Sequence, residues 1–176
     1  LMYSVAGGLA FSVLFSYFSL SAFFLIDHMH LNLITYGLLV ALNAIALIMM
    51  ALIAPRLHKK HTLFALMQCS FFIMLIGGGA MWLMNTLSLN TPATFMVPMF
   101  LATLGIGLLR PVSSTGVMNL APSHLTGSTS ALFNFIVFIM GALACSVSAL
   151  FIHTIPAFGL YICTLSVMGL SLHKIN

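Results

Sequence analysis

One stretch decides the fold of this chain: LITYGLLVALNAIALIMMALI, which runs from Leu33 to Ile53 without a charged side chain. Crossing the hydrocarbon core of a bilayer, about 30 Å thick, takes about 20 predominantly apolar residues in a helix. The stretch has that length, and it places only one amide, Asn43, near its middle. We therefore predict a transmembrane helix over residues 33–53.

The rest of the chain repeats this pattern. Its 176 residues are 62% hydrophobic and 3% charged, whereas a soluble domain is roughly a quarter charged. Backbone groups in lipid must be bonded internally, and the runs lack the alternating pattern of a barrel wall. We predict an all-α membrane protein, one six-transmembrane-helix bundle over residues 1–176, with spans at about 3–26, 33–53, 63–84, 95–118, 128–152 and 157–172.

Composition and spacing argue against a nucleic-acid partner, a metal site and a cofactor. The net charge of +4 comes from five Lys and Arg against one acid, too few and too dispersed to follow a phosphate backbone, so we predict no nucleic-acid partner. Asp27, His28 and His30 lie close together, but they have no distant fourth ligand and are interpreted as solvated loop residues. We predict neither a metal site nor a cofactor.

The basic residues predict an orientation. Arg56, Lys59 and Lys60 lie in the second connection, and Lys174 follows the sixth span. With an even number of spans these positions share one side, which the positive-inside rule makes cytoplasmic. The single acid, Asp27, then lies on the opposite side. We predict both termini in the cytoplasm.

The first predicted span carries a polar stripe. Ser12, Ser16 and Ser19 share one face at i, i+4 and i+7 spacing. Small hydroxyl residues allow close helix packing, but the same stripe would also suit the wall of a polar cavity. Both interpretations stay open.

Amides and an aromatic residue interrupt two other apolar runs. Asn43 lies in the second span and Asn134 one turn inside the fifth, where an amide either bonds a neighbouring helix or a substrate. Phe138 follows Asn134 by one turn, and it offers either an aromatic wall to planar compounds or a packing contact.

Small residues mark a contact face on the fifth span. Gly141, Cys145 and Ala149 recur at four-residue intervals. Small side chains let helices approach closely in lipid, so we expect this seam to pack against a neighbour.

The fourth span is expected to bend. Gly105 and Gly107 weaken its hydrogen-bond ladder, and Pro111 removes one amide donor in mid-membrane, which favours a kink. Arg110 lies about 5 Å from the midpoint of the span, where insertion of a cation costs roughly 2.5–3.5 kcal/mol. We expect Arg110 to face a polar cavity, the alternative being that it snorkels to the headgroups.

Several of these segments resemble one family in order and spacing. They are AGGLAF at 6–11, YGLLVALN at 36–43, RLHKK at 56–60, the Gly105, Gly107 and Pro111 pattern, and TGSTSA at 126–131. Together they resemble the second half of the Bcr/CflA-type drug:proton antiporters, members of the major facilitator superfamily. Arg110 does not belong to the family pattern.

The resemblance implies half of a twelve-helix carrier in the bacterial inner membrane, whose N-terminal six-helix half is missing here. It implies proton-coupled efflux of drugs or small amphipathic compounds by alternating access. The first, second, fourth and fifth helices would line the central cavity, and the third and sixth would face lipid. The expected lining residues are Ser16, Asn43, Arg110, Asn134 and Phe138.

Two other interpretations compete with transport. A chain that opens on Leu1 looks like a fragment, so a non-transporting remnant or an assembly subunit of a carrier is the main alternative. A membrane-embedded enzyme would need a nucleophile and a base at membrane depth, and no buried His or acid accompanies a Gly-x-Ser-x-Gly turn. We predict that the chain is not an enzyme.

Overall fold

The computed structural model describes residues 2–87, 91–151 and 154–172, and within these ranges it contains helices and no strand. Most helix ends lie within three residues of the predicted limits. The predicted end of the fifth span at 152, and Lys174, lie outside the described residues. The elements are α1 (Met2–Ala22), the π-helical turn η1 (Phe23–His28), α2 (Leu33–His58), α3 (Leu63–Thr86), α4 (Pro92–Met118), the short 3-10 helix η2 (Ser123–Leu125), α5 (Thr126–Phe151) and α6 (Ile155–Ser171).

One helix extends well beyond its predicted limit. The apolar run ends at 53, but α2 continues through Pro55 to His58. The predicted limit at 53 marks the end of the apolar run before Pro55 and Arg56, whereas backbone hydrogen bonding continues into the polar region beyond the hydrocarbon. Five of the described helices are long and apolar enough to cross a membrane, and α6 has 17 residues and is shorter.

Local capping explains where the helices begin. Asn32 accepts a hydrogen bond from the backbone N–H of Ile34 before α2, and Thr62 does so from Ala65 before α3, at 3.2 Å. Thr91 forms a reciprocal capping box with Thr94 ahead of α4. These side chains satisfy amide groups that the first turn leaves without partners.

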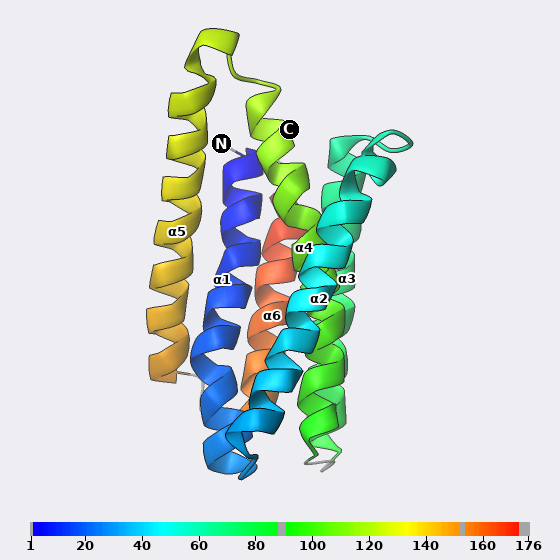
Figure 1. Ribbon diagram of the computed structural model, residues 1–176, viewed down its shortest axis with the longest axis vertical. Helices are drawn as coiled ribbons and strands as arrows, with labels where there is room; N and C mark the ends of the chain where they lie inside the picture. The colour runs from blue at the N-terminus through cyan, green and yellow to red at the C-terminus, as the bar shows by residue number, and fades with distance from the viewer. Residues whose placement is uncertain (1, 88–90, 152–153, 173–176) are drawn as a thin grey trace.

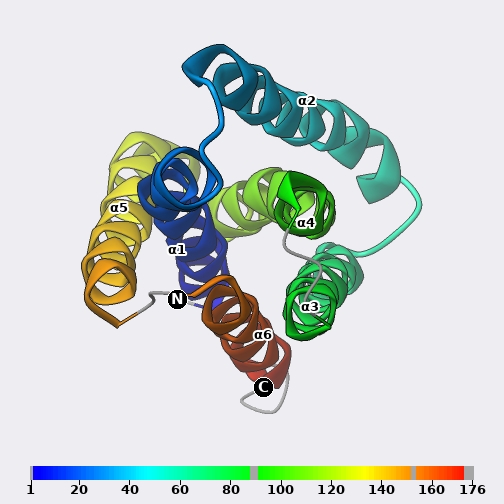
Figure 2. The ribbon, with the colours of Figure 1, turned by 90° about the horizontal axis from the view of Figure 1, so that it is seen from below.

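The helices are arranged around a central pair, α1 and α4. Figure 2 shows α5 beside α1 and α2 beside α4, with α3 and α6 on the other side of the pair. Accordingly, 67% of the most apolar window of α1 and of α4 is buried, against 17% for α2 and α5. The start of α1, the α2–α3 connection and the α4–α5 connection lie at one end of the bundle (Figure 1).

Glycines bring the backbones of three helices into close contact. A Cβ on Gly77 of α3 would lie 2.7 Å from the backbone nitrogen of Ala102 in α4. A Cβ on Gly159 of α6 would lie 2.8 Å from the backbone nitrogen of Trp82 in α3. Only glycine allows such an approach, so α3, α4 and α6 form a tightly packed block, called here the glycine block.

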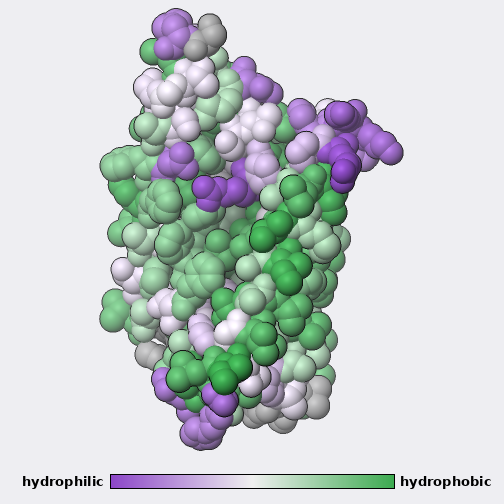
Figure 3. Space-filling view, in the orientation of Figure 1, coloured by the Kyte–Doolittle hydropathy of each residue, from purple (hydrophilic) through white to green (hydrophobic). Residues whose placement is uncertain are grey.

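The exterior has the distribution expected in a bilayer. Figure 3 shows a broad hydrophobic belt between hydrophilic surfaces at the two ends of the bundle. Large apolar side chains on α2 and α5 are exposed, among them Leu38, Leu42, Leu132 and Leu143. Lipid is the solvent that such a surface fits.

Candidate substrate-binding face

The central pair of helices is recessed between α5 and α2 on one face of the bundle (Figures 1 and 2). A cleft of about 200 Å³ opens between α1, α2 and α4, here called the Arg110 cleft. Its walls are mostly apolar, and Arg110 supplies its one charged side chain. It is lined by Phe11, Leu14, Leu47, Ala51, Ile106, Gly107 and Arg110.

Arg110 is held by an aromatic ring. Its guanidinium carbon lies 3.9 Å from the ring centroid of Phe11 on α1, a cation–π contact worth about 0.5–2 kcal/mol depending on desolvation. Within the described part of the chain the half-buried guanidinium has no hydrogen-bond or ion-pair partner. Its five N–H donors are therefore free for an acceptor supplied from elsewhere.

Three phenylalanines from two helices extend this contact. The ring centroids of Phe11 and Phe15 are 5.5 Å apart, and Phe138 of α5 lies 6.0 Å from each, edge to face. Phe138 is 51% exposed. The structure thus joins two of the predicted residues, Arg110 and Phe138, through Phe11 and Phe15, and we call these four residues the Arg110 cluster.

The other predicted polar residues bond elsewhere. Ser16 is fully buried, with its hydroxyl 3.3 Å from the Tyr161 hydroxyl and 3.4 Å from the Ala144 carbonyl. It therefore links α1 to α5 and α6. Asn134 is half-buried and donates to the carbonyl of Ser130 in its own helix, at 3.0 Å.

Asn43 forms a tie between α2 and α1. Its Nδ2 donates to the Tyr17 hydroxyl at 3.0 Å, and the side chain is 4% exposed. Its Oδ1 is buried and accepts no hydrogen bond from the described residues. Asn43 thus makes an interhelical contact, and it also lines a cavity of about 440 Å³ between α2 and α4.

Along α4, each of the three residues predicted to weaken the helix, Gly105, Gly107 and Pro111, has different neighbours. A Cβ on Gly105 would lie 2.6 Å from the Ser70 carbonyl of α3, and one on Gly107 would lie 3.1 Å from the Leu47 Cα of α2. Pro111 lies inside the helix and lines a separate cavity near the end of α2. In Figure 1 the later part of α4 leans toward α5.

The small-residue face of α5 follows the helical repeat. Gly141 is buried, and its Cβ position would lie 2.8 Å from the Phe15 ring of α1. Cys145 is half-buried, but the next buried position is Ser148, and Ala149 is exposed. Four-residue spacing drifts around a helix of 3.6 residues per turn, so the seam continues through the residue at i+3.

Phe11, Phe15 and Tyr17 are not among the residues predicted from the sequence. Phe11 and Phe15 are one turn apart in the same span as the serine stripe, and this i, i+4 spacing was an available signal. For Tyr17 the sequence carries no signal, because its partner is contributed by another helix. Within the described ranges no group of three or more His, Cys, Asp or Glu could hold a metal ion.

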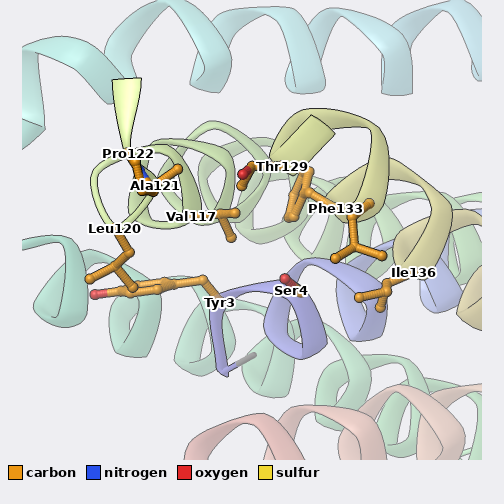
Figure 4. A pocket seen from close by; sticks show the side chains of 10 residues that line it. Tyr3, Ser4, Val117, Leu120, Ala121, Pro122, Thr129, Phe133 and Ile136 are labelled. Atoms are coloured by element: carbon orange, nitrogen blue, oxygen red, sulfur yellow. The ribbon is translucent and has the colours of Figure 1, made fainter. Parts of the chain in front are cut away.

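A further cavity of about 310 Å³ lies where α4 turns toward α5. Figure 4 shows Tyr3 and Ser4 of α1 on one side, Val117 of α4 and Leu120 of the following turn on another, and Phe133 of α5 beside them. Its side-chain polar groups are hydroxyls only, without a charge. The cavity offers less for recognition than the Arg110 cluster.

These features define an integral membrane protein that presents a recessed, partly polar face. The family model of the Major Facilitator Superfamily matches residues 1–145, so the chain belongs to this superfamily of membrane transporters. No curated protein matches the chain. The predicted fold, an all-α membrane bundle that makes up half of a superfamily carrier, is confirmed, with the lipid bilayer and a small-molecule substrate as its partners.

Proposed function

We propose that this bundle is the C-terminal half of a proton-coupled exporter of drugs or small amphipathic compounds, of the Bcr/CflA type. It would work by alternating access in the bacterial inner membrane, with both termini cytoplasmic. The superfamily match and the resemblance of the 6–11, 36–43, 56–60 and 126–131 segments support this proposal. The observation that carries it is the Arg110 cluster.

The cluster has the chemistry that amphipathic compounds require. Phe138 offers an exposed aromatic surface to a planar apolar group. The Arg110 guanidinium, 3.9 Å from the Phe11 ring centroid, offers hydrogen bonds to an acidic or carbonyl group. A compound with both features can bind across α1, α4 and α5 together.

The cluster also favours a partner that carries an acid. A cation at membrane depth is costly without a counter-charge. The only acidic side chain of the chain, Asp27, lies in η1 at the end opposite the α2–α3 connection. The acid would therefore come from the substrate or from the N-terminal six-helix half that closes over the recessed face.

The fold supports alternating access through its unequal packing. The glycine block joins α3, α4 and α6 into a stiff unit, whereas α2 and α5 are largely exposed. A stiff bundle can rock as one body against a second bundle around a central site. The recessed face between α5 and α2 is where the two would meet.

Substitution of Arg110 tests this function in a carrier assembled with an N-terminal half. Arg110→Lys is expected to lower drug efflux at least about tenfold, because an ammonium loses the bidentate geometry of the guanidinium. Arg110→Ala should do the same and leave an opposing acid without its partner. Lys60→Gln, which removes one charge from a connection, is the control. Efflux and membrane abundance are measured together, and wild-type efflux from Arg110→Ala at equal abundance would exclude the proposed site.

A second measurement separates transport from a purely structural role. Vesicles that contain only this chain should show no drug-stimulated proton flux, because the chain offers no membrane-embedded acid for the proton. Addition of an N-terminal half should restore the flux. Flux from the chain alone would contradict the half-carrier proposal, and its absence from the assembled pair would favour an assembly subunit.

A further inference from the structure

The end of α2 carries a concentrated positive charge that no acidic side chain in the described part of the chain balances. Arg56, Lys59 and Lys60 are exposed there, together with His58 and His61. They include three of the five Lys and Arg of the chain, and the single acidic side chain, Asp27, lies at the other end of the bundle. Figure 3 shows the most intensely hydrophilic surface over this α2–α3 connection.

An apolar cavity adjoins this charge. It has a volume of about 240 Å³ and lies between the end of α2, the start of α3 and the last turns of α4. His58 and Lys59 line it beside apolar side chains, and the hydroxyl of Thr115 is its other polar side-chain group. The full lining is Ala54, Pro55, His58, Lys59, Leu63, Pro111, Val112 and Thr115.

The start of α3 adds to the positive potential. Leu63, its first residue, lines the cavity, and Thr62 caps the helix through the backbone N–H of Ala65. The amino end of a helix carries a partial positive charge that favours an anion. Two independent features, the basic side chains and the helix end, therefore favour a negative group at the mouth of this cavity.

From this juxtaposition we propose that the cavity binds one anionic phospholipid, whose phosphate lies against Lys59 and whose acyl chain enters between α2 and α4. Arg56 and Lys60 contribute further positive potential at the headgroup. A free phosphate ion would gain nothing from the apolar walls, and a zwitterionic lipid would gain little from the charge. The combination selects a lipid with a net negative headgroup.

The location fits this ligand. The cavity lies beside the last turn of α2, and Figure 3 shows that the hydrophobic belt meets a hydrophilic surface at this end of the bundle. A basic pocket between transmembrane helices at this depth can receive a headgroup and an acyl chain together. The proposal does not depend on the transport activity or on the Arg110 cluster.

Binding of defined lipids to the purified chain tests the proposal. Dioleoylphosphatidylglycerol and dioleoylphosphatidylcholine are titrated in detergent, and bound lipids are counted by native mass spectrometry. We expect phosphatidylglycerol to bind at least about tenfold more tightly. Each cation near an anionic headgroup contributes about fivefold in affinity. Lys59→Gln should therefore lower the affinity for phosphatidylglycerol by about that factor or more. Equal binding of the two lipids would overturn the proposal.

Two comparisons distinguish a built site from general attraction. Lys60→Gln removes the same charge one residue away, but Lys60 does not line the cavity, so its effect should be smaller than that of Lys59→Gln. Thr115→Phe should fill the cavity and reduce binding of phosphatidylglycerol, with the helix content by circular dichroism unchanged. Equal effects of the two lysine variants, or competition by inorganic phosphate at equal concentration, would overturn the site.

Discussion

Two helix contacts in this bundle are made in opposite ways. α3 and α4 meet backbone to backbone, with the Cβ positions of Gly77 and Gly105 within 2.7 Å and 2.6 Å of main-chain atoms of the other helix. α1 and α5 meet through side chains, where Gly141 faces the ring of Phe15. A ring can rotate, whereas a helix backbone cannot move without moving the helix. The difference separates a stiff block from a face that can adapt to a ligand.

The same difference describes the surroundings of the proposed substrate face. The Arg110 cluster lies where α1, α4 and α5 meet through rings and a long cation. In the glycine block, α3 packs against α4 from the other side, so Arg110 projects from a closely packed helix toward aromatic side chains of α1. This arrangement joins a positioned charge to an apolar wall made of side chains, and the proposed binding of amphipathic compounds rests on that combination.

The largest effect should come from filling the backbone contact of the glycine block. Gly77→Ala would place a methyl group 2.7 Å from the Ala102 nitrogen and 2.8 Å from the Pro98 carbonyl oxygen. Since neither atom can move alone, we expect a loss of about 2–3 kcal/mol in the free energy of unfolding. The measurement is unfolding in mixed micelles, followed by far-ultraviolet circular dichroism.

The same glycine triplet supplies the control. A Cβ on Gly79, two residues on, would have no neighbour within 4 Å. Gly79→Ala should therefore be neutral or gain up to about 1 kcal/mol from helix propensity. If both variants lost stability equally, the backbone contact would not be the cause, and the contrast between the two helix contacts would fail.

The triplet also shows how far the sequence could predict the fold. Three consecutive glycines indicate close packing somewhere, but the side of α3 that meets α4 follows only from the helix rotation in the folded bundle. Span positions are predictable because apolar length is a property of each segment alone. The division between α3–α4 and α1–α5 contacts is a property of pairs of segments.

The candidate site also contains residues that could be predicted from one segment alone and contacts that depend on pairs of segments. Arg110 could be selected from sequence because a cation at membrane depth is unusual by itself. Its position over Phe11 could not, since Phe11 is one of 15 phenylalanines in the chain. Asn43 could also be selected from sequence, because a polar amide in an apolar span is unusual. Its partner Tyr17 could not, because Tyr17 has no distinguishing feature in its own span.

A smaller effect is expected at the contact that ties α2 to the central pair. Tyr17→Phe removes the acceptor of the Asn43 amide, and Asn43→Ala removes its donor. Interhelical hydrogen bonds in membranes average about 0.6 kcal/mol and reach about 1.7. We expect a coupling energy in this range from a double-mutant cycle in the same unfolding assay. A coupling near zero would mean that this hydrogen bond does not hold α2, and would leave that role to apolar packing and to the Ser21–Tyr36 hydroxyl contact of 3.1 Å between α1 and α2.

The smallest effect is predicted for the adaptable contact, at Gly141. Alanine there would place its Cβ 2.8 Å from Cδ2 of the Phe15 ring, which is closer than normal, but the ring can turn away at little cost. Replacement of glycine by alanine in a helix also gains about 1 kcal/mol of helix propensity, so this gain and the cost of turning the ring nearly cancel.

We expect Gly141→Ala to change the free energy of unfolding by no more than about 0.5 kcal/mol after this offset. Gly79→Ala, at an interior helix position with no neighbour within 4 Å, is the control that reports the propensity gain alone. The difference between the two variants then measures how readily Phe15 moves. A difference of about 3 kcal/mol, as large as that between Gly77→Ala and Gly79→Ala, would show that the α1–α5 contact is as stiff as the glycine block, and the aromatic wall around Arg110 would then be fixed rather than adaptable.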